Sequence, residues 1–464
     1  MKDQVKSTGI LILLFAGVLM GALDISIVGP AIPSIEKTLH LTDKDLTWIY
    51  TIYILLNLVG ISFMAKLSDF FGRRSVYILS LLIFGAGSFM VSVSHDITLL
   101  LVGRAIQGFG SSGIFPVASA TIGDVFPVEK RGRALGLIGA VFGLAFIMGP
   151  FIAGFMLMYF DWNSLFIINI PVSLVLIIFA FRLLPGRKVG KKVRFDWSGI
   201  ILMGIVLTAF SLAMNNVNTS RLPESLGEWN VLPFLLLTVI LTPMLMMLEQ
   251  TQEEPVLNTR LFKSRQVRLV GFIALGVGLF QSSIVFLPKY AVDVFHVSPS
   301  AASFMLLPLV IATALGSPVT GRLVDAIGSK IIIITGLFLT ATALFILSLI
   351  SRNPVFFYTA EALLGFGLSV RASLNYIMLN EVPPHERATT QGILIIFISI
   401  GQIIGATLFG TIASAYQKET QGFGYSFLLI TGLAAVLFLL SFFLKNRSRE
   451  HESAEKLFDM QKIA

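Results

Sequence analysis

Two acidic side chains interrupt long apolar stretches of the sequence, Asp24 near its start and Glu361 in its last third. If these stretches cross a bilayer, each acid costs about 3 kcal/mol or more to insert and is a functional candidate by default. A carboxyl group in that position can bind and release a proton or meet a charged ligand. Two basic side chains, Arg104 and Arg371, stand in similar apolar stretches and supply charges that a carboxylate or an anionic ligand would neutralise.

Asp24 and Arg104 are expected to lie at similar depth. Asp24 is about nine residues and Arg104 about five residues from the predicted outer ends of their segments. At about 1.5 Å per helical residue, these depths differ by only ~6 Å. We therefore predict that the two side chains interact, directly or through water, and that Asp24 with Arg104 takes part in proton or substrate coupling. The alternative is a permanent structural ion pair.

Glu361 lies about seven residues from the predicted outer end of its own segment. We expect it to take part in proton coupling as well, and the alternative is an interfacial carboxylate that reaches outer water near Arg352. Arg371 lies ten residues beyond Glu361, which is ~15 Å along a helix, so direct pairing of the two is not expected. Arg371 is a candidate for binding an anionic group in a cavity between helices, or for pairing with a carbonyl oxygen.

Other polar side chains lie in or beside the apolar stretches. Interhelical hydrogen bonds are their commoner use, and lining a substrate cavity is the functional alternative. The candidates for such a lining are Tyr53, Asn57, Gln107, Gln281 and Asn375.

The composition requires a membrane around these segments. Hydrophobic residues make up 55% of the 464 residues and charged residues only 13%, whereas about a quarter of a soluble domain is charged. A helix needs roughly 20 apolar residues to cross a bilayer core of ~30 Å, and that length yields fourteen candidate spans. They lie near 9–33, 48–65, 76–94, 99–122, 134–159, 165–180, 197–214, 231–247, 270–288, 301–320, 331–350, 354–379, 392–414 and 425–444.

Lysine and arginine are distributed unevenly between the two sides of these spans. With the N-terminus in the cytoplasm, 26 of the 34 fall in inner segments, 6 in outer loops and 2 inside spans. This bias predicts a multi-pass protein of the cell membrane with both termini cytoplasmic. It also explains the net charge of +8 without a nucleic-acid partner. Lys289 is one of the six residues assigned to the outer loops.

The chain repeats two patterns at nearly one spacing. Asp69 and Gly72 correspond to Asp325 and Gly328 at an offset of 256 residues. The Gly-Phe-Gly sequence at 108–110 recurs at 365–367, and the same offset of 257 places Arg104 opposite Glu361. Repeated halves of six spans are typical of many secondary transporters, whose substrate site lies between the halves.

The repeat divides the chain into four predicted parts. The offset is longer than six spans with short loops require, so it leaves room for two extra helices between the halves. We therefore predict an all-α integral membrane fold of fourteen spans. Its parts are an N-terminal six-helix half at 1–183, a linker with two extra transmembrane helices at 184–268, a C-terminal six-helix half at 269–445 and a cytoplasmic tail at 446–464.

Four motifs together resemble the major facilitator superfamily, and in particular its fourteen-span drug:proton antiporters. They are the loop 65–74, the fourth-span sequence 104–110, the fifth-span residues Gly136, Gly149, Pro150 and Gly154, and the first-span sequence 23–33. The resemblance implies a gate formed by Asp69, Gly72, Arg73 and Arg74, with Asp325 as the repeated counterpart, and a fifth helix loosened at its proline. Anchoring of positive charges on the inner side and close packing of small residues are the alternatives.

The resemblance also implies a function, namely multidrug efflux and antibiotic resistance through proton-coupled antiport of amphipathic compounds by alternating access. A lipid or anionic-amphiphile exporter, or a proton-linked importer on the same fold, is the alternative. The expected partners are small amphipathic substrates, protons and the lipid bilayer, and a monomer is expected. An enzyme is not expected, because no cluster of acids, histidine or serine with a base lies at one membrane face. With no cysteine, five scattered histidines and no nucleotide-binding loop, neither a metal nor a cofactor is expected.

Overall fold

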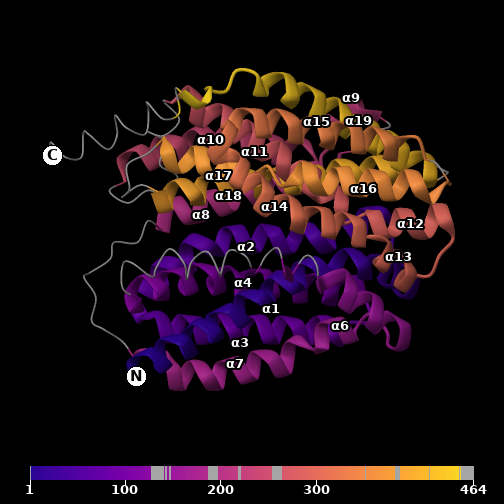
Figure 1. Cartoon of the computed structure of the whole chain (residues 1–464). Coiled ribbons are helices and arrows are strands. Elements are labelled where there is room, and N and C mark those ends of the chain that lie inside the picture. Colours follow the sequence, from indigo (N-terminus) through magenta and orange to yellow (C-terminus); the bar gives the residue numbers. More distant parts are fainter. Residues whose placement is uncertain are drawn as a thin grey trace. The chain divides into compact units, whose positions relative to one another are not determined.

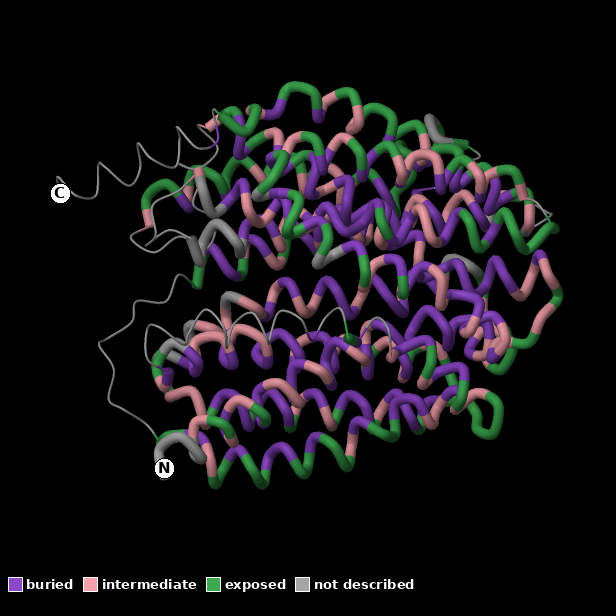
Figure 2. Tube along the Cα trace, viewed as in Figure 1, coloured by how far each residue is buried: buried purple, intermediate pink, exposed green. Residues whose placement is uncertain are grey.

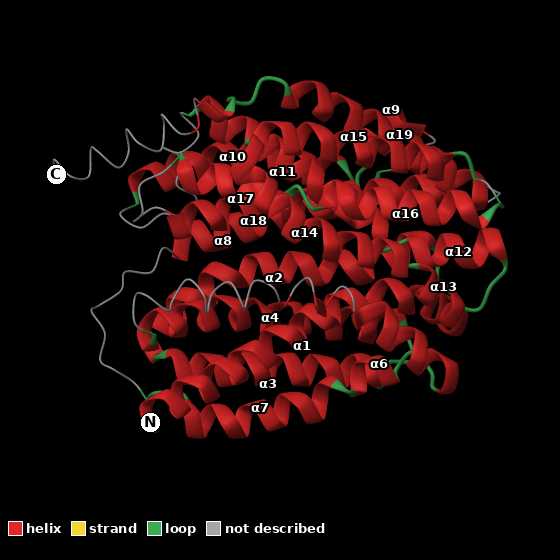
Figure 3. Ribbon diagram, in the orientation of Figure 1, coloured by secondary structure: helices red, strands yellow, loops and turns green. Residues whose placement is uncertain are grey.

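The computed structural model is helical throughout the part of the chain that it describes, and no strand occurs there (Figure 3). The described residues are 2–126, 141, 144–145, 148–186, 197–217, 221–252, 264–350, 352–381, 387–416, 419–448 and 450. Helices suit a bilayer because each helix satisfies its own backbone N–H and C=O groups where no water is available.

The chain divides into two compact units. Unit 1 consists of Met1–Ile200 with Val297–Phe304, and unit 2 of Ile201–His296 with Met305–Ala464. In unit 1, α4 packs between α2 and α3, and α7 lies against α1 and α3 (Figure 1). The helices of unit 1 are α1 (Lys2–Leu39), α2 (Asp43–Phe71), α3 (Arg73–Ser92), α4 (Ile97–Val125), an unlabelled helix at Met148–Tyr159, α6 (Ser164–Ile167) and α7 (Asn169–Leu183), with most of α13 (Pro299–Met305).

Unit 2 contains the residues of the predicted C-terminal half except 297–304, and the predicted linker helices from residue 201 on. In it, α16 packs against α14 and α15, α11 packs against α18, and α15 packs against α19. Its helices are α8 (Trp197–Asn216) from residue 201 on, α9 (Leu222–Leu226), α10 (Leu232–Thr251), α11 (Arg265–Ile284), α12 (Leu287–Phe295), α14 (Leu307–Ile327), α15 (Ser329–Ser348), α16 (Pro354–Leu368), α17 (Arg371–Asn380), α18 (Arg387–Ser414) and α19 (Glu419–Ser441).

Twelve helices in the described part of the chain are long and apolar enough to cross a bilayer. Two shorter apolar helices, Asp45–Ile61 and Met148–Tyr159, occupy the places of the predicted spans 48–65 and 134–159. Much of the second of these spans lies outside the described residues. The structure therefore supports an all-helical membrane protein with twelve candidate spans, and the count of fourteen stays a prediction.

Polar side chains set the outer ends of several helices. Thr42 and Asp45 form a reciprocal capping box at the start of α2. The carboxylate of Asp96 accepts a hydrogen bond from the backbone N–H of Leu99 at 2.9 Å, and so caps α4. These caps fix the first turns of α2 and α4, the helices that carry Tyr53 and Arg104.

The internal repeat predicted from the sequence is confirmed by the packing. A Cβ added to Gly108 would overlap the carbonyl of Tyr53 on α2, and one added to Gly110 would overlap the backbone of α3. Gly365 and Gly367 are placed in the same way against α14 and α15. The two Gly-Phe-Gly sequences therefore let a central helix approach both neighbours closely in each unit.

The loop glycines repeat as well. Gly72 joins α2 to α3 with φ 89°, and Gly328 joins α14 to α15 with φ 85°. Positive φ at these angles is strained for residues that carry a Cβ. The corresponding turns therefore have the same backbone conformation in both units.

Three membrane segments of unit 2 are broken, which hydropathy alone did not predict. The breaks fall between α11 and α12, at Leu306 before α14, and at Ser369–Val370 between α16 and α17. Proline lies in the first turn after the first two breaks. The first break also corrects the assignment of Lys289 to an outer loop, because Lys289 lies on α12, is 1% exposed and pairs with Asp293 at 3.3 Å.

The exposed faces of the outer helices are apolar, as contact with lipid requires. On α7, Leu174, Val175 and Ile178 are exposed, whereas Ser173 and Ala180 are buried (Figure 2). In water such a continuous apolar face would be a liability. The polar side chains of α7 within the span, Asn169 and Ser173, are buried instead.

Candidate functional site

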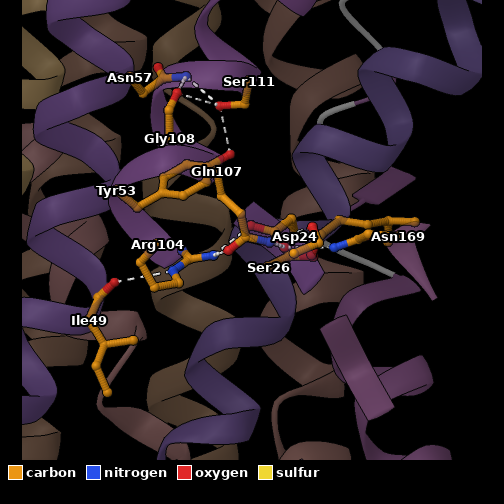
Figure 4. Close-up of polar contacts among 12 residues, drawn as sticks. Asp24, Ser26, Ile49, Tyr53, Asn57, Arg104, Gln107, Gly108, Ser111 and Asn169 are labelled. Atoms are coloured by element: carbon orange, nitrogen blue, oxygen red, sulfur yellow. Dashed lines mark hydrogen bonds and ion pairs between the residues drawn. The ribbon is translucent and has the colours of Figure 1, made fainter. Parts of the chain in front are cut away.

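The centre of unit 1 holds a charged carboxylate that is shut off from solvent. Asp24 of α1 is 0% exposed and accepts three side-chain hydrogen bonds (Figure 4). Its Oδ2 accepts from Nη1 of Arg104 at 2.6 Å, and its Oδ1 accepts from Nε2 of Gln107 at 3.0 Å and Nδ2 of Asn169 at 2.9 Å. Gln107 also donates to the hydroxyl of Ser88 at 2.7 Å. The predicted contact between Asp24 and Arg104 is therefore direct.

The guanidinium of Arg104 is enclosed as completely as its counter-ion. Its Nη1 also donates to Oε1 of Gln107 at 2.9 Å, and its Nε donates to the carbonyl of Ile49 at 3.3 Å. Its central carbon lies 4.2 Å from the ring centroid of Tyr53 and 5.7 Å from that of Phe166, so the rings add cation–π attraction. Its Nη2 has no hydrogen-bond partner in the described part of the chain.

A second layer of hydrogen bonds orients the Tyr53 ring. The hydroxyl of Tyr53 donates to Oγ of Ser111 at 2.8 Å, and Nδ2 of Asn57 donates to the same oxygen at 2.6 Å. Asn57 is also 3.4 Å from the carbonyl of Gly108. Three of the residues predicted to line a cavity, Tyr53, Asn57 and Gln107, thus form hydrogen bonds in this network. Hydrogen bonding between helices was the alternative use considered for them.

The network links five helices around one charge pair, since Ser88 lies on α3. Asp24 comes from α1, Arg104 and Gln107 from α4, Asn169 from α7, and the carbonyl of Ile49 from α2. Removing one partner of a buried ion pair leaves an uncompensated charge and is strongly unfavourable, whereas the intact pair contributes little net stability. Loss of either charge would therefore disturb the contacts of all the helices that the network joins.

The predicted fifth-helix motif lies against the same part of α1. Ser26 donates to the carbonyl of Ala145 at 2.9 Å, and a Cβ added to Gly149 would overlap the Ser26 side chain. Gly154 lies against the ring of Phe304. Pro150 follows Gly149 in the described helix, and Gly136 lies outside the described residues. The small residues therefore serve close packing here.

The predicted gate residues surround the turn at Gly72 between α2 and α3. Nε of Arg73 pairs with Oδ2 of Asp124 at 3.0 Å, and its Nη1 donates to Ser68 at 2.6 Å. Nη1 of Arg74 is 3.4 Å from the carbonyl of Phe181. We call the contact between Arg73 and Asp124 the latch, because it ties the start of α3 to the end of α4.

Two of the predicted gate residues cannot be placed in the latch. The side chains of Asp69 and Asp325 lie outside the described part of the structure. Asp124, in contrast, was missed by the sequence reasoning. It follows Gly123 at the end of a span and has the pattern of an ordinary helix-end acid, so no sequence signal singled it out.

The predicted site residues of unit 2 do not form a comparable network. Gln281 accepts from Gln402 at 3.2 Å. Arg371 starts α17 directly after the break at Ser369–Val370, is intermediate in exposure, and Asn375 lies one turn further along. Glu361 is 0% exposed on α16, so the alternative of a carboxylate that reaches outer water is wrong. Among the described residues, no group of three or more His, Asp or Glu side chains is placed to bind a metal ion.

Comparison with known proteins identifies a family and relatives with the same architecture. The sequence profile of the Major Facilitator Superfamily matches residues 14–194 and 269–461, and leaves out the segment that contains α8 and α10. The chain is 31% identical over 420 residues to the multidrug transporter protein MdtP of Bacillus subtilis (strain 168), which covers 89% of this chain and 76% of the relative. It is 28% identical over 419 residues to the riboflavin transporter RibZ of Clostridioides difficile (strain 630), at 89% and 90% coverage. Its fold is similar to the crystal structure of the nucleoside transporter NupG, with a TM-score of 0.65 at 16% identity over 95% of this chain and 100% of that one.

Proposed function

The chain belongs to the Major Facilitator Superfamily, and we propose that it exports amphipathic compounds in exchange for protons by alternating access. It is a multi-pass membrane transporter rather than an enzyme. The relative MdtP is named as a multidrug transporter, which supports amphipathic drugs as the substrate class. Multidrug efflux and a part in antibiotic resistance follow from that class.

The observation that carries proton coupling is the pair of fully buried carboxyl groups. Asp24 and Glu361 are both 0% exposed, one in unit 1 and one in unit 2. An acid inside the membrane is costly, and such residues mark proton relays in transporters. A proton that enters on one of these acids as substrate leaves would complete an antiport cycle.

Transport in proteoliposomes tests this function. Purified protein is reconstituted, a pH gradient is imposed, and uptake of a panel of fluorescent amphipathic cations is followed. We expect accumulation that follows the proton gradient and collapses when a protonophore is added. Liposomes without protein are the control. Flux that is indifferent to the gradient would contradict proton coupling, and flux of anionic compounds alone would contradict the substrate class.

The membrane arrangement belongs to the same proposal. We propose fourteen spans, a location in the cell membrane and cytoplasmic termini, supported by the bias of 26 inner against 5 outer Lys and Arg residues once Lys289 is placed on α12. The predicted halves and linker at 1–183, 184–268 and 269–445 belong to this arrangement, with a monomer as the working unit.

Arg371 favours a second candidate function, the export of lipids or other anionic amphiphiles. Its guanidinium has no hydrogen bond or ion pair within the described residues, and it begins a helix after a break. Arginine cannot lose its proton to escape an unpaired state. An anionic or zwitterionic substrate group would supply the missing charge. A proton-linked importer would use the same groups in the opposite direction, and the sidedness of the flux in proteoliposomes separates the two.

A further inference from the structure

Glu361 is a buried carboxyl group that the network of unit 1 does not involve. It is 0% exposed, and neither Oε1 nor Oε2 has a hydrogen-bond partner in the described part of the chain. An isolated carboxylate in an apolar environment is so unfavourable that the group takes up a proton instead. Glu361 is therefore a neutral carboxylic acid in this conformation.

The packing around Glu361 explains its isolation. One turn further along α16, Gly365 lies directly against the backbone of α14 at Leu309. One turn earlier, the Phe357 ring stacks on Tyr290 of α12, with centroids 5.7 Å apart. One turn to either side of Glu361, α16 thus packs against backbone and an aromatic ring, and neither contact supplies a counter-charge.

Among the described residues, no charged group of the neighbouring elements forms a hydrogen bond with Glu361. On α14, Arg322 is thirteen residues beyond Leu309, which is ~20 Å along the helix. On α12, Lys289 and Asp293 pair with each other at 3.3 Å. The titratable or charged side chains on the elements that contact α16, and on α16 and α17 themselves, are Lys289, Tyr290, Asp293, Arg322, Asp325, Lys330, Tyr358, Arg371 and Tyr376.

The internal repeat shows how the second half lost the partners that the first half provides. Glu361 occupies the position of Arg104 in the 257-residue register. In that register Asp24, Gln107 and Asn169 correspond to Gln281, Leu364 and Ser426. Gln281 bonds to Gln402, and Ser426 donates to backbone carbonyls. An acid thus stands where the first half has a base, and the corresponding neighbours are an amide, an apolar side chain and a hydroxyl that is bonded to the backbone.

The two buried acids therefore differ in what they are able to do. The Asp24 carboxylate has a guanidinium at 2.6 Å and two amide donors, all of which favour the ionised form. We propose that Glu361 binds and releases the coupled proton, whereas Asp24 stays ionised in a permanent pair with Arg104. This proposal rests on the proposed function, because it names the residue that carries the exchanged proton.

The step is a simple proton transfer. In this conformation Glu361 is a carboxylic acid closed to solvent. In a conformation that opens its side of α16 to water, the O–H bond breaks, the proton goes to water and the carboxylate is left hydrated. Because a hydrated carboxylate resists burial, the closed state returns only after the proton is bound again or after a cationic substrate group has replaced it.

Transport separates this role from a structural one. In proteoliposomes, Glu361→Gln should lose accumulation driven by a pH gradient but keep exchange of internal for external substrate, which needs no net proton movement. Glu361→Asp should restore part of the driven accumulation. Driven accumulation at the wild-type level in Glu361→Gln would overturn the proposal. So would loss of exchange in a variant whose thermal unfolding midpoint is unchanged.

An infrared measurement on the protein alone tests the protonation state without any substrate. The carbonyl stretch of a protonated carboxyl should be present in wild-type protein, fall as pH rises, and be missing from Glu361→Gln. It should persist in the double variant Asp24→Asn/Arg104→Gln, which removes the ion pair as a unit. A band that persists in Glu361→Gln and is lost in the double variant would overturn the assignment. If wild-type flux does not depend on the pH gradient while the infrared band is lost in Glu361→Gln, proton antiport is contradicted but the protonated state of Glu361 is confirmed.

Discussion

Among single residues, Asp24 and Arg104 depend on each other more than on any other neighbour. Each is almost fully buried, and their closest atoms are 2.6 Å apart. In such a pair the desolvation of both charges offsets most of the attraction between them. Replacing one member should therefore be worse than replacing both.

Asp24→Asn should lower stability because it leaves the Arg104 guanidinium buried without a counter-ion. The expected loss is about 3–5 kcal/mol, seen as a lower midpoint of thermal unfolding in detergent. Asp24→Asn/Arg104→Gln should recover most of that loss. If the single variant were as stable as the wild type, or the double variant less stable than the single one, Asp24 and Arg104 would not depend on each other for stability.

Arg371→Gln should change which substrate charges are accepted. Without the guanidinium, anionic and zwitterionic amphiphiles lose a binding partner, and monovalent cations lose a like charge that repels them where water is scarce. We expect weaker competition by anionic compounds and stronger competition by cations in a binding assay. Arg371→Lys is the matched control, since it keeps the charge. Equal effects on both substrate classes would remove Arg371 from substrate recognition.

The sequence predicted the residues of the ion pair better than their surroundings. Counting helical residues from the span ends sufficed to put Asp24 and Arg104 at one depth. Ser88 and Ser111 were not singled out, because serine is common in membrane helices and gives no signal of the side chain it faces. Hydrogen-bond partners on other helices depend on rotation about each helix axis, which the hydropathy of a span does not fix.

At the scale of helices, close backbone approach in each unit depends on the Gly-Phe-Gly sequences. Gly108→Ala places a methyl group on the carbonyl of Tyr53, so α2 and α4 must separate. Overpacking of this kind costs about 1–3 kcal/mol and should lower the unfolding midpoint. Gly432→Ala on α19 is the control, because a Cβ there meets nothing within 4 Å. Equal effects of the two substitutions would argue against the close-packing role.

The latch joins the start of α3 to the end of α4, so its loss should act on conformational change. Arg73→Gln and Asp124→Asn should each slow turnover more than they weaken substrate binding, and the double variant should be no slower than either one. Arg74→Gln is the control, because Arg74 has only a long contact with a backbone carbonyl, at 3.4 Å. Binding that collapses while turnover per bound substrate is unchanged would reassign Arg73 to the substrate site.

The breaks inside the helices of unit 2 mark the limit of reading spans from hydropathy. A window of apolar residues has the same mean value whether its helix is continuous or broken. Pro288 and Pro308 offered a local signal, since proline removes a backbone donor and fits the first turn of a helix. The break before Arg371 has no proline, and nothing in the sequence there distinguishes it from a continuous helix.

For the whole molecule, the repeat was the most informative sequence signal. Two short motifs at offsets of 256 and 257 residues predicted paired loop glycines and paired close contacts, and both are found. The repeat did not predict that the positions of Asp24 and Arg104 would carry Gln281 and Glu361 in the second half, where the described residues form no corresponding ion pair. That asymmetry arises from single substitutions at corresponding positions, which leave the backbone pattern unchanged.

The number and direction of the spans can be tested on the full chain, because it contains no cysteine. Single cysteines at the exposed positions Thr38, Asp161 and Glu224 should react with a membrane-impermeant maleimide in intact cells, since each lies in a predicted outer loop. Ser75→Cys and Ser448→Cys should react only after the membrane is permeabilised.

Labelling of Thr38→Cys but not Ser75→Cys requires that α2 crosses the bilayer, and labelling of Asp161→Cys requires the same of the helix that ends at Tyr159. Labelling of Glu224→Cys places α8 and α10 across the membrane as well. If Asp161→Cys or Glu224→Cys is protected in intact cells, the fourteen-span arrangement is wrong, and labelling of Ser448→Cys in intact cells would place the C-terminus outside.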